Sequence, residues 1–404
     1  MPHVVHVFTV ADSLLFLRGQ VAFMRARGYE VTVVSSPSEA LDAFGRDEGV
    51  AVHGVSMPRR ITPGEDAKSL ARLALLLRRL GPEIVHSHTP KGGLLGTIAG
   101  ALARVPVRIY HMRGLPLMTA QGMQRAILTA TERTSCALAT RVLAVSASLR
   151  EVALAENLCR PSKIQVLGAG SGQGVDCESF DPARLPADTR QTFRERLGVP
   201  GDAPVIGFVG RCVRDKGIVE LVDAWRQLRE WHPAAQLVVA GVFEERDAIP
   251  AQTRRALEDD PRVHLLGFVV DTPALFGAID VLALPTYREG FPNVPLEAAA
   301  MRVAVVTTRV PGCIDAVEDG VTGTLVPVRD APALARALHC YLEDATLRAR
   351  HGMSARARVQ RFFQRERLWE AVANVYDELL SARGLPRATA LGSGSPPAAR
   401  DSRC

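Results

Sequence analysis

Two glutamates carry much of the chemistry that this sequence offers. Glu289 and Glu297 are separated by seven residues within the stretch 284–301, LPTYREGFPNVPLEAAAM. The apolar run before it predicts a buried strand, and the helix formers from Leu296 onward predict a helix after it. Glu289 would then lie in a loop and Glu297 in the first helical turn, at the carboxyl end of a strand where ligands bind in α/β sheets. The plainer alternative is a solvated Glu289 and a Glu297 that complements the helix dipole.

A basic motif, GRCVRDKG (210–217), follows the apolar run 205–209. Arg211 and Lys216 at the end of a strand can neutralise a diphosphate, while Gly210 and Gly217 allow backbone amides to approach it. A basic surface turn is the alternative for the motif alone. The strand before the motif and the glutamate pair together favour ligand binding.

Three histidines end apolar runs of the N-terminal half. His111 closes VRIYH (107–111), and His86 and His88 lie two residues apart in IVHSH (84–88). Residues two apart in a strand share one face, so the spacing of His86 and His88 would suit two ligands of a metal ion. No third ligand is evident in the sequence, and we therefore predict no metal site.

Two series of alternating strands and helices must position these residues. Strands are predicted at 4–10, 31–35, 51–55, 84–88, 107–111, 141–145 and 163–167, then at 205–209, 236–240, 263–267, 281–284 and 303–307, with a long terminal helix at 361–380. This alternation is typical of parallel sheets covered by helices on both faces, an α/β fold. Two doubly wound domains favour a nucleotide-type ligand bound between them.

The chain of 404 residues is long enough for two domains, and a segment rich in Pro, Asp and Arg (181–202) indicates where they meet. We expect an N-terminal domain at 1–184, a C-terminal domain at 185–365 and a C-terminal helix at 366–383. The tail at 384–404 lacks the apolar residues needed to pack and is expected to be disordered.

The composition of the chain indicates which partners the protein binds and in which cellular compartment it works. Residues 50–150 hold 14 Lys and Arg against 4 Asp and Glu, a balance of +10. This excess favours an anionic partner such as a lipid headgroup or lipid diphosphate, with an arginine-rich surface as the alternative. Aromatic residues make up only 5% of the chain, which argues against nucleic acid. The seven cysteines form no CxxC pair, and no signal peptide is evident, so we expect a cytoplasmic protein with reduced thiols.

The basic motif and the glutamate stretch together resemble the retaining glycosyltransferases of family 4. The runs LGAGSGQGVDCESFDP (167–182) and PGCIDAVEDGVTGTLVPVRD (311–330) also fit this family, and the resemblance spans residues 4–380. VHSHTPKGGLLG and VRIYHMRGLP are similar to the bacterial subset that builds surface polysaccharides and lipid-linked glycans. The resemblance implies the GT-B fold, with two Rossmann-like domains facing a deep cleft and a C-terminal helix that crosses back to the first domain.

The resemblance also implies roles for individual residues. Arg211 and Lys216 would bind the donor diphosphate, beside Gly210, and Glu297 would accept hydrogen bonds from the ribose. The residues expected at the donor sugar are Glu289, Gly290, Phe291 and Pro292. His111 matches the family histidine that orients this sugar, with a structural strand-end histidine as the alternative.

On the acceptor side, we expect His88, Lys91 and Arg113, although a solvated Lys91 fits equally well. The implied reaction moves a sugar from a nucleotide-sugar, UDP-linked by expectation, to a glycan or polyprenyl-diphosphate-linked acceptor with retention of configuration. No metal or other cofactor is expected. The basic segment and the apolar helix after Pro90 are expected to dock on the anionic inner face of the cytoplasmic membrane.

Some features depart from the family, and other functions compete with transfer. The first loop, VADS (10–13), lacks the Gly-Gly pair that cups the diphosphate in many members, and Gly19 follows only later. The run GAGSGQG (168–174) does not match the G-x-G-x-x-G fingerprint of an NAD-dependent oxidoreductase. A sugar-nucleotide epimerase and a non-catalytic sugar-nucleotide binding protein remain as alternatives.

Overall fold

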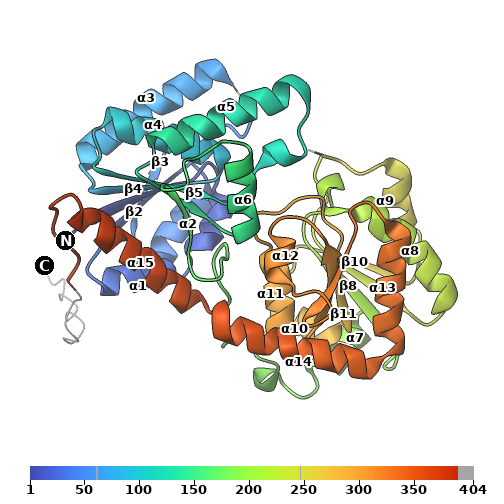
Figure 1. Cartoon of the computed structure of the whole chain (residues 1–404). Coiled ribbons are helices and arrows are strands. Elements are labelled where there is room, and N and C mark those ends of the chain that lie inside the picture. The colour runs from blue at the N-terminus through green and yellow to red at the C-terminus, as the bar shows by residue number, and fades with distance from the viewer. Residues whose placement is uncertain (61, 246, 390–404) are drawn as a thin grey trace, which may run out of the picture. The chain divides into compact units, whose positions relative to one another are not determined.

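The computed structural model describes residues 1–60, 62–245 and 247–389, and these contain two parallel β-sheets (Figure 1). The first sheet has seven strands in the order β3-β2-β1-β4-β5-β6-β7. Its strands are β1 (His3–Val7), β2 (Glu30–Ser35), β3 (Ala51–Gly54), β4 (Ile84–His88), β5 (Val107–Met112), β6 (Arg141–Ala144) and β7 (Ile164–Val166).

The second sheet has six strands in the order β10-β9-β8-β11-β12-β13. Its strands are β8 (Val205–Val209), β9 (Gln236–Ala240), β10 (Val263–Gly267), β11 (Val281–Leu284), β12 (Ala304–Thr308) and β13 (Gly323–Val326). Strand order reverses around β8, whose neighbours are β9 and β11. Open α/β sheets bind ligands beyond the carboxyl ends of the strands at such a switch point.

Helices alternate with the strands along the whole chain. In the first half they are α1 (Gln20–Ala26), α2 (Glu39–Glu48), α3 (Pro63–Leu80), α4 (Pro90–Leu102), α5 (Gly122–Leu138) and α6 (Ala147–Ala155). The second half holds α7 (Thr189–Arg196), α8 (Ile218–Trp231), α9 (Ala251–Glu258), α10 (Thr272–Ala278), α11 (Asn293–Ala300), α12 (Cys313–Ala316), α13 (Ala331–Glu343), α14 (Ala345–Phe362) and α15 (Arg365–Ser381). Short 3-10 helices are η1 (Ala11–Leu17), η2 (Pro116–Met118), η3 (Pro182–Arg184) and η4 (Arg214–Lys216).

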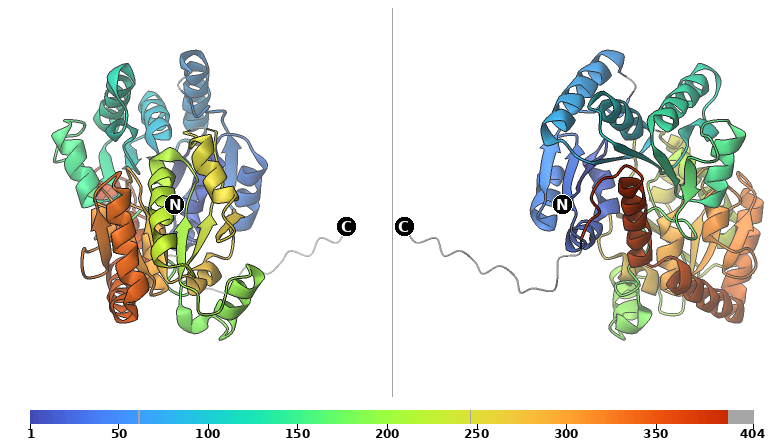
Figure 2. Two further views of the ribbon diagram at one scale, coloured as in Figure 1. Left: turned by 90° about the vertical axis from the view of Figure 1, so that its right-hand side faces the viewer. Right: turned by 60° about the vertical axis from the view of Figure 1, so that its left-hand side comes forward.

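The two faces of the first sheet differ in character. Val5, Val7 and Val85 point to the face covered by α3 and α4, where they join one hydrophobic core. His6, His86 and His88 alternate with these valines on β1 and β4, so they project from the opposite face. There His86 meets Tyr376 of α15, which Figure 2 shows lying along the first sheet. The face toward α3 and α4 is thus mainly apolar, and the other buries the three imidazole rings.

The second sheet is organised around a single large core. Alternate residues of β8, β9, β11 and β12 pack against α8 and α13, with Trp225 and Leu338 among the helix residues that cover them. Burying these aliphatic and aromatic side chains stabilises the sheet by about 25 cal/mol per Å² of apolar surface removed from water. The core thereby fixes the ends of β8 and β11, from which the loops with the predicted site residues emerge.

Two elements differ from the sequence-based prediction. β13 was not predicted, and the expected helix at 361–380 starts too early: α14 ends at Phe362, and α15 begins only at Arg365. The division has a tertiary cause, because Gln364 forms a parallel bridge with Val175. The Val175 amide donates to the Phe363 carbonyl at 2.8 Å, and the Arg365 amide donates to the Val175 carbonyl at 3.1 Å. These bonds accompany the break in helical geometry at residues 363 and 364.

The apolar helix after Pro90 has a packing role that was not predicted. We expected α4 to dock on a membrane, which stays a prediction, and the structure packs α4 on the first sheet and against α3. Gly93 lies against the Tyr110 ring and Gly96 against Ser87, so closely that a Cβ at either glycine would clash. The small residues of α4 therefore serve close packing on the sheet.

The chain divides into two compact units whose bounds differ from the predicted domains. The first unit comprises residues 1–110 and 137–141 with the C-terminal segment from Trp369, and the second comprises residues 111–136 and 142–368. In the first unit α15 packs through Trp369 on Phe23 and through Asp377 on the Tyr29 hydroxyl. This confirms that the C-terminal helix returns to the first sheet. The domain bounds at 184 and 365 stay predictions.

Part of the predicted disordered tail, residues 390–404, lies outside the described residues. Among the described residues, the six cysteines are all free thiols. The described helices include none with the length and apolar character required to span a bilayer.

Candidate functional site

The acid loop (residues 285–292) connects β11 to α11 in the second unit. As predicted, Glu289 lies in this loop. Helix α11 begins at Asn293, earlier than expected, with Pro295 inside its first turn. Glu297 is therefore the fifth residue of the helix and lies in the second turn, which corrects the predicted position by a few residues. Proline is tolerated there because the first helical amides lack intrahelical acceptors anyway.

Glu297 is partly buried and has no hydrogen-bond or ion-pair partner among the described residues. Burial raises the pKa of Glu297 from 4.5 to about 7. A carboxylate kept from water without a partner is costly, and donors supplied by a ligand would relieve that cost. Perturbed carboxyl groups of this kind are typical of functional sites.

Lys216 and Glu289 form an ion pair that joins the basic loop (residues 210–217) to the acid loop. The two side chains are only 20% and 13% exposed. Charges withdrawn from water to this extent need each other, since the loss of either leaves its partner desolvated. The structure thus brings together one residue from each sequence motif.

Arg211 lies at the other end of the basic loop, and its ion pair is more exposed than that of Lys216. Its guanidinium forms an ion pair with Glu244 at 3.0 Å, and its side chain is 52% exposed. An exposed pair of this kind contributes little to stability and can exchange for another anion. Gly210, just before it, has a φ of 150° and donates its amide to the Ala240 carbonyl at 2.9 Å.

Asp215 and Arg288 were missed by the sequence analysis, yet they fasten the two loops together. Arg288 donates to the Asp215 carboxylate through Nε at 2.8 Å and forms an ion pair through Nη2 at 2.6 Å. The Asp215 carbonyl also accepts from the Tyr287 amide at 2.8 Å. Opposite charges in loops that follow neighbouring strands were the available signal, because β8 and β11 are adjacent.

Backbone contacts at two glycines set the spacing of the loops. Gly217 has a φ of 73°, and a Cβ there would lie 2.0 Å from the Pro285 carbonyl oxygen. A Cβ on Gly290 would lie 2.0 Å from the Arg113 carbonyl oxygen. Real side chains do not tolerate such distances, so only glycine fits at either position. Gly290 therefore rests on the chain just beyond β5, which carries Arg113.

Two serines at the start of α6 also bind the acid loop and its neighbour, and neither was predicted. Ser146 caps α6 and donates its hydroxyl to the Gly290 carbonyl at 2.7 Å. Ser148 donates to Asp315 of α12 and accepts the Gly312 amide at 2.7 Å. A helix-capping serine is common in any helix, so the sequence held no sign of this second role.

The other predicted donor-side residues belong to the same unit as the acid loop. Phe291 is buried against Phe363, with ring centroids 5.5 Å apart, and Pro292 precedes the first turn of α11. His111 is buried at the end of β5. Arg113 donates to the Gly172 carbonyl. The second unit therefore holds His111, Arg113 and both glutamates, although we predicted the first two in a separate domain.

His88 and Lys91 lie in the first unit, in environments that the sequence did not indicate. Lys91 forms an ion pair with Asp66 at 2.6 Å and donates to the Pro58 carbonyl. It is neither solvated nor extended toward a ligand. His88 is 1% exposed and stacks on Phe8 with centroids 4.1 Å apart. The acceptor-side prediction for these two residues gains no support from their placement.

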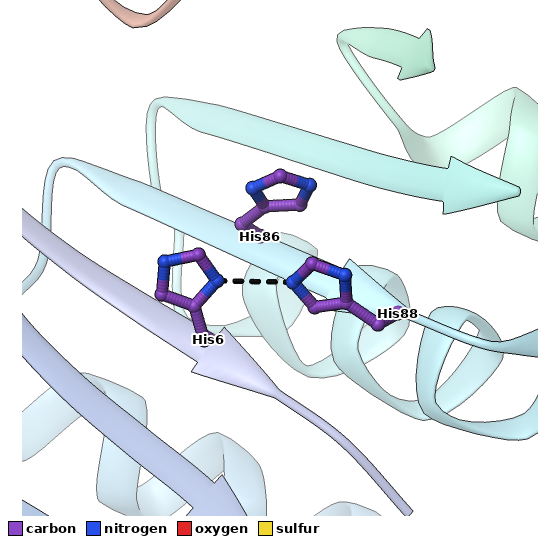
Figure 3. Close-up of side chains that lie close together, drawn as sticks. All are labelled: His6, His86 and His88. Atoms are coloured by element: carbon purple, nitrogen blue, oxygen red, sulfur yellow. Dashed lines mark hydrogen bonds between the residues drawn. The ribbon is translucent and has the colours of Figure 1, made fainter. Parts of the chain in front are cut away.

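His88 also belongs to a cluster of three imidazoles, His6, His86 and His88, which we term the histidine cluster (Figure 3). His6 Nδ1 and His88 Nε2 share a hydrogen bond of 3.0 Å, and His86 Nδ1 bonds the Tyr376 hydroxyl at 2.6 Å. The sequence analysis found no third partner for His86 and His88, and this was wrong. The third imidazole comes from the neighbouring strand β1, which spacing along one strand cannot show.

Two doubly wound parallel sheets, with an acid and a basic loop at the carboxyl ends of adjacent central strands, are consistent with the GT-B fold. A family model described as "Glycosyl transferases group 1" matches residues 203–344, and one described as "Glycosyl transferase 4-like domain" matches residues 16–170. The chain is 36% identical over 375 residues to the capsular polysaccharide biosynthesis glycosyltransferase CapM of Staphylococcus aureus, covering 93% of this chain and 97% of the relative. This chain belongs to the family 4 glycosyltransferases.

Two further proteins extend the comparison. An Escherichia coli enzyme named UDP-Gal:alpha-D-GlcNAc-diphosphoundecaprenol alpha-1,3-galactosyltransferase is 26% identical over 322 residues, covering 79% of this chain and 81% of that enzyme. The structure of Anabaena HepE in complex with UDP-glucose superposes with a TM-score of 0.79 at 21% identity, covering 94% of this chain and 100% of that one. The second match shows the shared fold.

Proposed function

We propose that this glycosyltransferase moves a sugar from a UDP-linked donor to a glycan carried on polyprenyl diphosphate, in the biosynthesis of a bacterial surface polysaccharide. The observation that carries the proposal is the Lys216–Glu289 ion pair at the switch point of the second sheet, followed in α11 by Glu297, which has no partner within the part of the chain that the structure describes. The names of the relatives support the substrates, since one gives a capsular polysaccharide and another gives UDP-Gal and a diphosphoundecaprenol acceptor.

The basic loop would receive the diphosphate of the donor. Lys216 would exchange part of its bond with Glu289 for a phosphate oxygen, and Arg211 would exchange its exposed pair with Glu244. Both cations then oppose the negative charge that grows on the leaving diphosphate. Gly210, at the end of β8, leaves room for the phosphates beside the backbone.

The acid loop and α11 would hold the two sugars of the donor. Glu297 would accept hydrogen bonds from the ribose hydroxyls, which supply the donors that its carboxylate lacks. Glu289, with the backbone of Gly290, Phe291 and Pro292, would contact the hydroxyls of the transferred sugar. His111, buried at the end of β5, would orient that sugar.

The proposed reaction retains the anomeric configuration. The bond from the anomeric carbon to the diphosphate oxygen breaks, and the acceptor hydroxyl forms a new bond from the same face. The proton of that hydroxyl passes to the departing diphosphate, so the products are the glycoside and nucleoside diphosphate with that proton. Attack on the leaving-group face needs no carboxylate base, and we propose that no metal or other cofactor takes part.

A basic face on α3 supports attachment to an anionic membrane, which we also propose. Arg72, Arg78 and Arg79 are exposed on this helix, together with Leu75, which is 63% exposed. Each cation near an anionic surface contributes about 1 kcal/mol to binding. In this proposal α3 takes the place that the sequence analysis gave to α4. Arg113, on the loop after β5, is the acceptor-side residue that we retain.

Calorimetric titration with a panel of nucleoside diphosphates and their sugars tests the donor site. We expect tight binding of the uridine compounds, which the Glu297→Ala variant loses. Product analysis with a polyprenyl-diphosphate-linked glycan then separates the alternatives. Binding without turnover would indicate a non-catalytic binding protein, interconversion of the sugar nucleotide would indicate an epimerase, and absence of binding would refute the proposal.

A further inference from the structure

Two histidines and a glutamate gather where two helices end on the outer side of the second unit. His232 directly follows α8, and His339 and Glu343 lie one turn apart near the end of α13. His232 Nε2 and His339 Nδ1 are 2.8 Å apart, and His232 Nδ1 lies 3.5 Å from a Glu343 carboxylate oxygen. We call these three residues the helix-end cluster. Helices α8 and α13 pack side by side, so the cluster rests on a fixed scaffold (Figure 1).

The histidine cluster of the first sheet is the other group of candidate metal ligands, and it is less suited to a cation than the helix-end cluster. Its imidazoles are all buried, and the rings of His86 and His88 are stacked at an angle of 23° with centroids 4.2 Å apart. Stacked rings do not direct their nitrogens at a common point, and the cluster includes no carboxylate (Figure 3). A divalent charge among three neutral rings in the core would be desolvated without an anion to balance it.

The helix-end cluster has the features that the buried one lacks. Glu343 supplies an anionic oxygen, and its side chain is 63% exposed, which leaves it free to turn toward a cation. In both clusters the candidate ligand atoms lie within 4.8 Å of one another, so the carboxylate and its exposure are what distinguish the helix-end cluster. Solvent can reach the cluster and provide the remaining ligands.

We propose that His232, His339 and Glu343 bind one divalent cation of the zinc class at the junction of α8 and α13. Two imidazole nitrogens with a carboxylate are a ligand set that zinc uses widely. The two nitrogens must separate from 2.8 Å to about 3.4 Å, as metal–nitrogen bonds near 2.1 Å in tetrahedral geometry require. Glu343, which lies against Nδ1 of His232, must turn toward the cation on the Nε2 side. The cation replaces the proton that the two rings share and links the helix ends.

Isothermal titration of the chelator-treated full-length protein with zinc chloride tests this site. We expect one ion per chain, and an affinity that falls at least about tenfold in both the His339→Ala and Glu343→Gln variants. His53→Ala, a histidine on the edge strand β3, is the matched control and should bind zinc as the parent does. Circular dichroism without zinc confirms that the variants are folded, and the exposed Glu343→Gln change leaves the helix intact.

The free thiol of Cys340 is the competing zinc ligand, because it is exposed and adjacent to His339. The Cys340→Ala variant should retain the zinc affinity of the parent protein. Loss of binding in this variant, with binding retained in His339→Ala, would overturn the proposal. It would also be overturned if the parent bound no zinc, or if neither His339→Ala nor Glu343→Gln weakened the affinity. None of these outcomes affects the donor site, so the two proposals fail separately.

Discussion

The acid and basic loops of the second sheet and the histidine cluster of the first sheet both place polar groups at the centre of a parallel sheet. In the histidine cluster each ring is buried and held by another ring, by Tyr376 or by Phe8. At the loops a ligand can separate Lys216 from Glu289, and Glu297 of the following helix α11 has no partner among the described residues. Buried polar groups that already have hydrogen-bond partners stabilise the fold. A carboxyl without a partner and an ion pair that a ligand can separate are instead suited to binding.

The largest effect should come from Lys216→Ala. Removing the ammonium takes a charge-assisted bond from the donor diphosphate, and we expect the affinity for UDP to fall roughly 100-fold, about 2.7 kcal/mol. Calorimetry measures this affinity directly. Lys68→Ala, which removes an exposed lysine paired with Glu65 on α3, is the control and should bind UDP normally. An unchanged affinity in Lys216→Ala would remove its proposed role.

The next effect concerns the pH dependence at Glu297. Ribose hydroxyls donate to the ionised carboxylate, so donor affinity should rise about tenfold between pH 6 and pH 8 if only that form binds.

Because burial raises the folded-state pKa of Glu297 from 4.5 to about 7, the folded state alone retains the proton between these values. Stability should therefore fall by about 1–3 kcal/mol as pH rises through that window.

Glu297→Gln tests both parts of this prediction. The amide does not titrate, so the affinity for UDP and the urea-unfolding free energy should both lose this contribution to their pH dependence. A variant that keeps the pH profile of the parent would show that another group titrates.

A smaller effect, on stability alone, is expected from Tyr376→Phe. The change removes the hydrogen bond to His86 within the first unit and should lower the unfolding free energy by about 1–2 kcal/mol. Urea denaturation measures this loss. The affinity for UDP should not change, and a large change in it would show that the histidine cluster is coupled to the donor site.

Ser146→Ala should give the smallest effect on donor binding. Ser146 shares one property with each of the two regions compared above. Its hydroxyl is buried and partnered like the histidine cluster, yet the partner is the Gly290 carbonyl of the acid loop. We expect KM for the donor sugar nucleotide to rise two- to fivefold, about 0.5–1 kcal/mol, with kcat nearly unchanged. Steady-state kinetics of Ser146→Ala and Ser148→Ala would distinguish the roles of the two serines, because Ser148→Ala removes a contact with α12 instead.

Much of the second sheet could be predicted because its strands are continuous apolar runs. The residues of β8, β9, β10 and β11 coincide with the predicted ones, since the carboxyl ends of these runs are marked by glycine or proline. The division between α14 and α15 could not be predicted, because it depends on pairing with Val175, which is remote in sequence. Local propensity favoured one long helix, and a tertiary contact overrode it.

The sequence predicted which residues belong to the candidate site, but it predicted few of the contacts between them. Glu289 and Lys216 were predicted for one site, but their ion pair and the partners of Arg211 and Lys91 were not. Both depend on acidic residues from other loops and helices, for which the sequence gave no spacing rule. His6 was missed for the same reason, because only the sheet register places it beside His86.

The close backbone contacts at Gly217 and Gly290 have a consequence for how this sequence can vary. Each contact joins a glycine to a carbonyl oxygen, of Pro285 and of Arg113, and a carbonyl is present whatever side chain its residue carries. Substitutions at the carbonyl partners therefore leave these backbone contacts intact, while any substitution at either glycine forces its neighbour away. Donor preference can be altered by exchanging side chains on the loops, but Gly217 fixes the distance between the basic and acid loops, and Gly290 fixes the acid loop on the chain after β5.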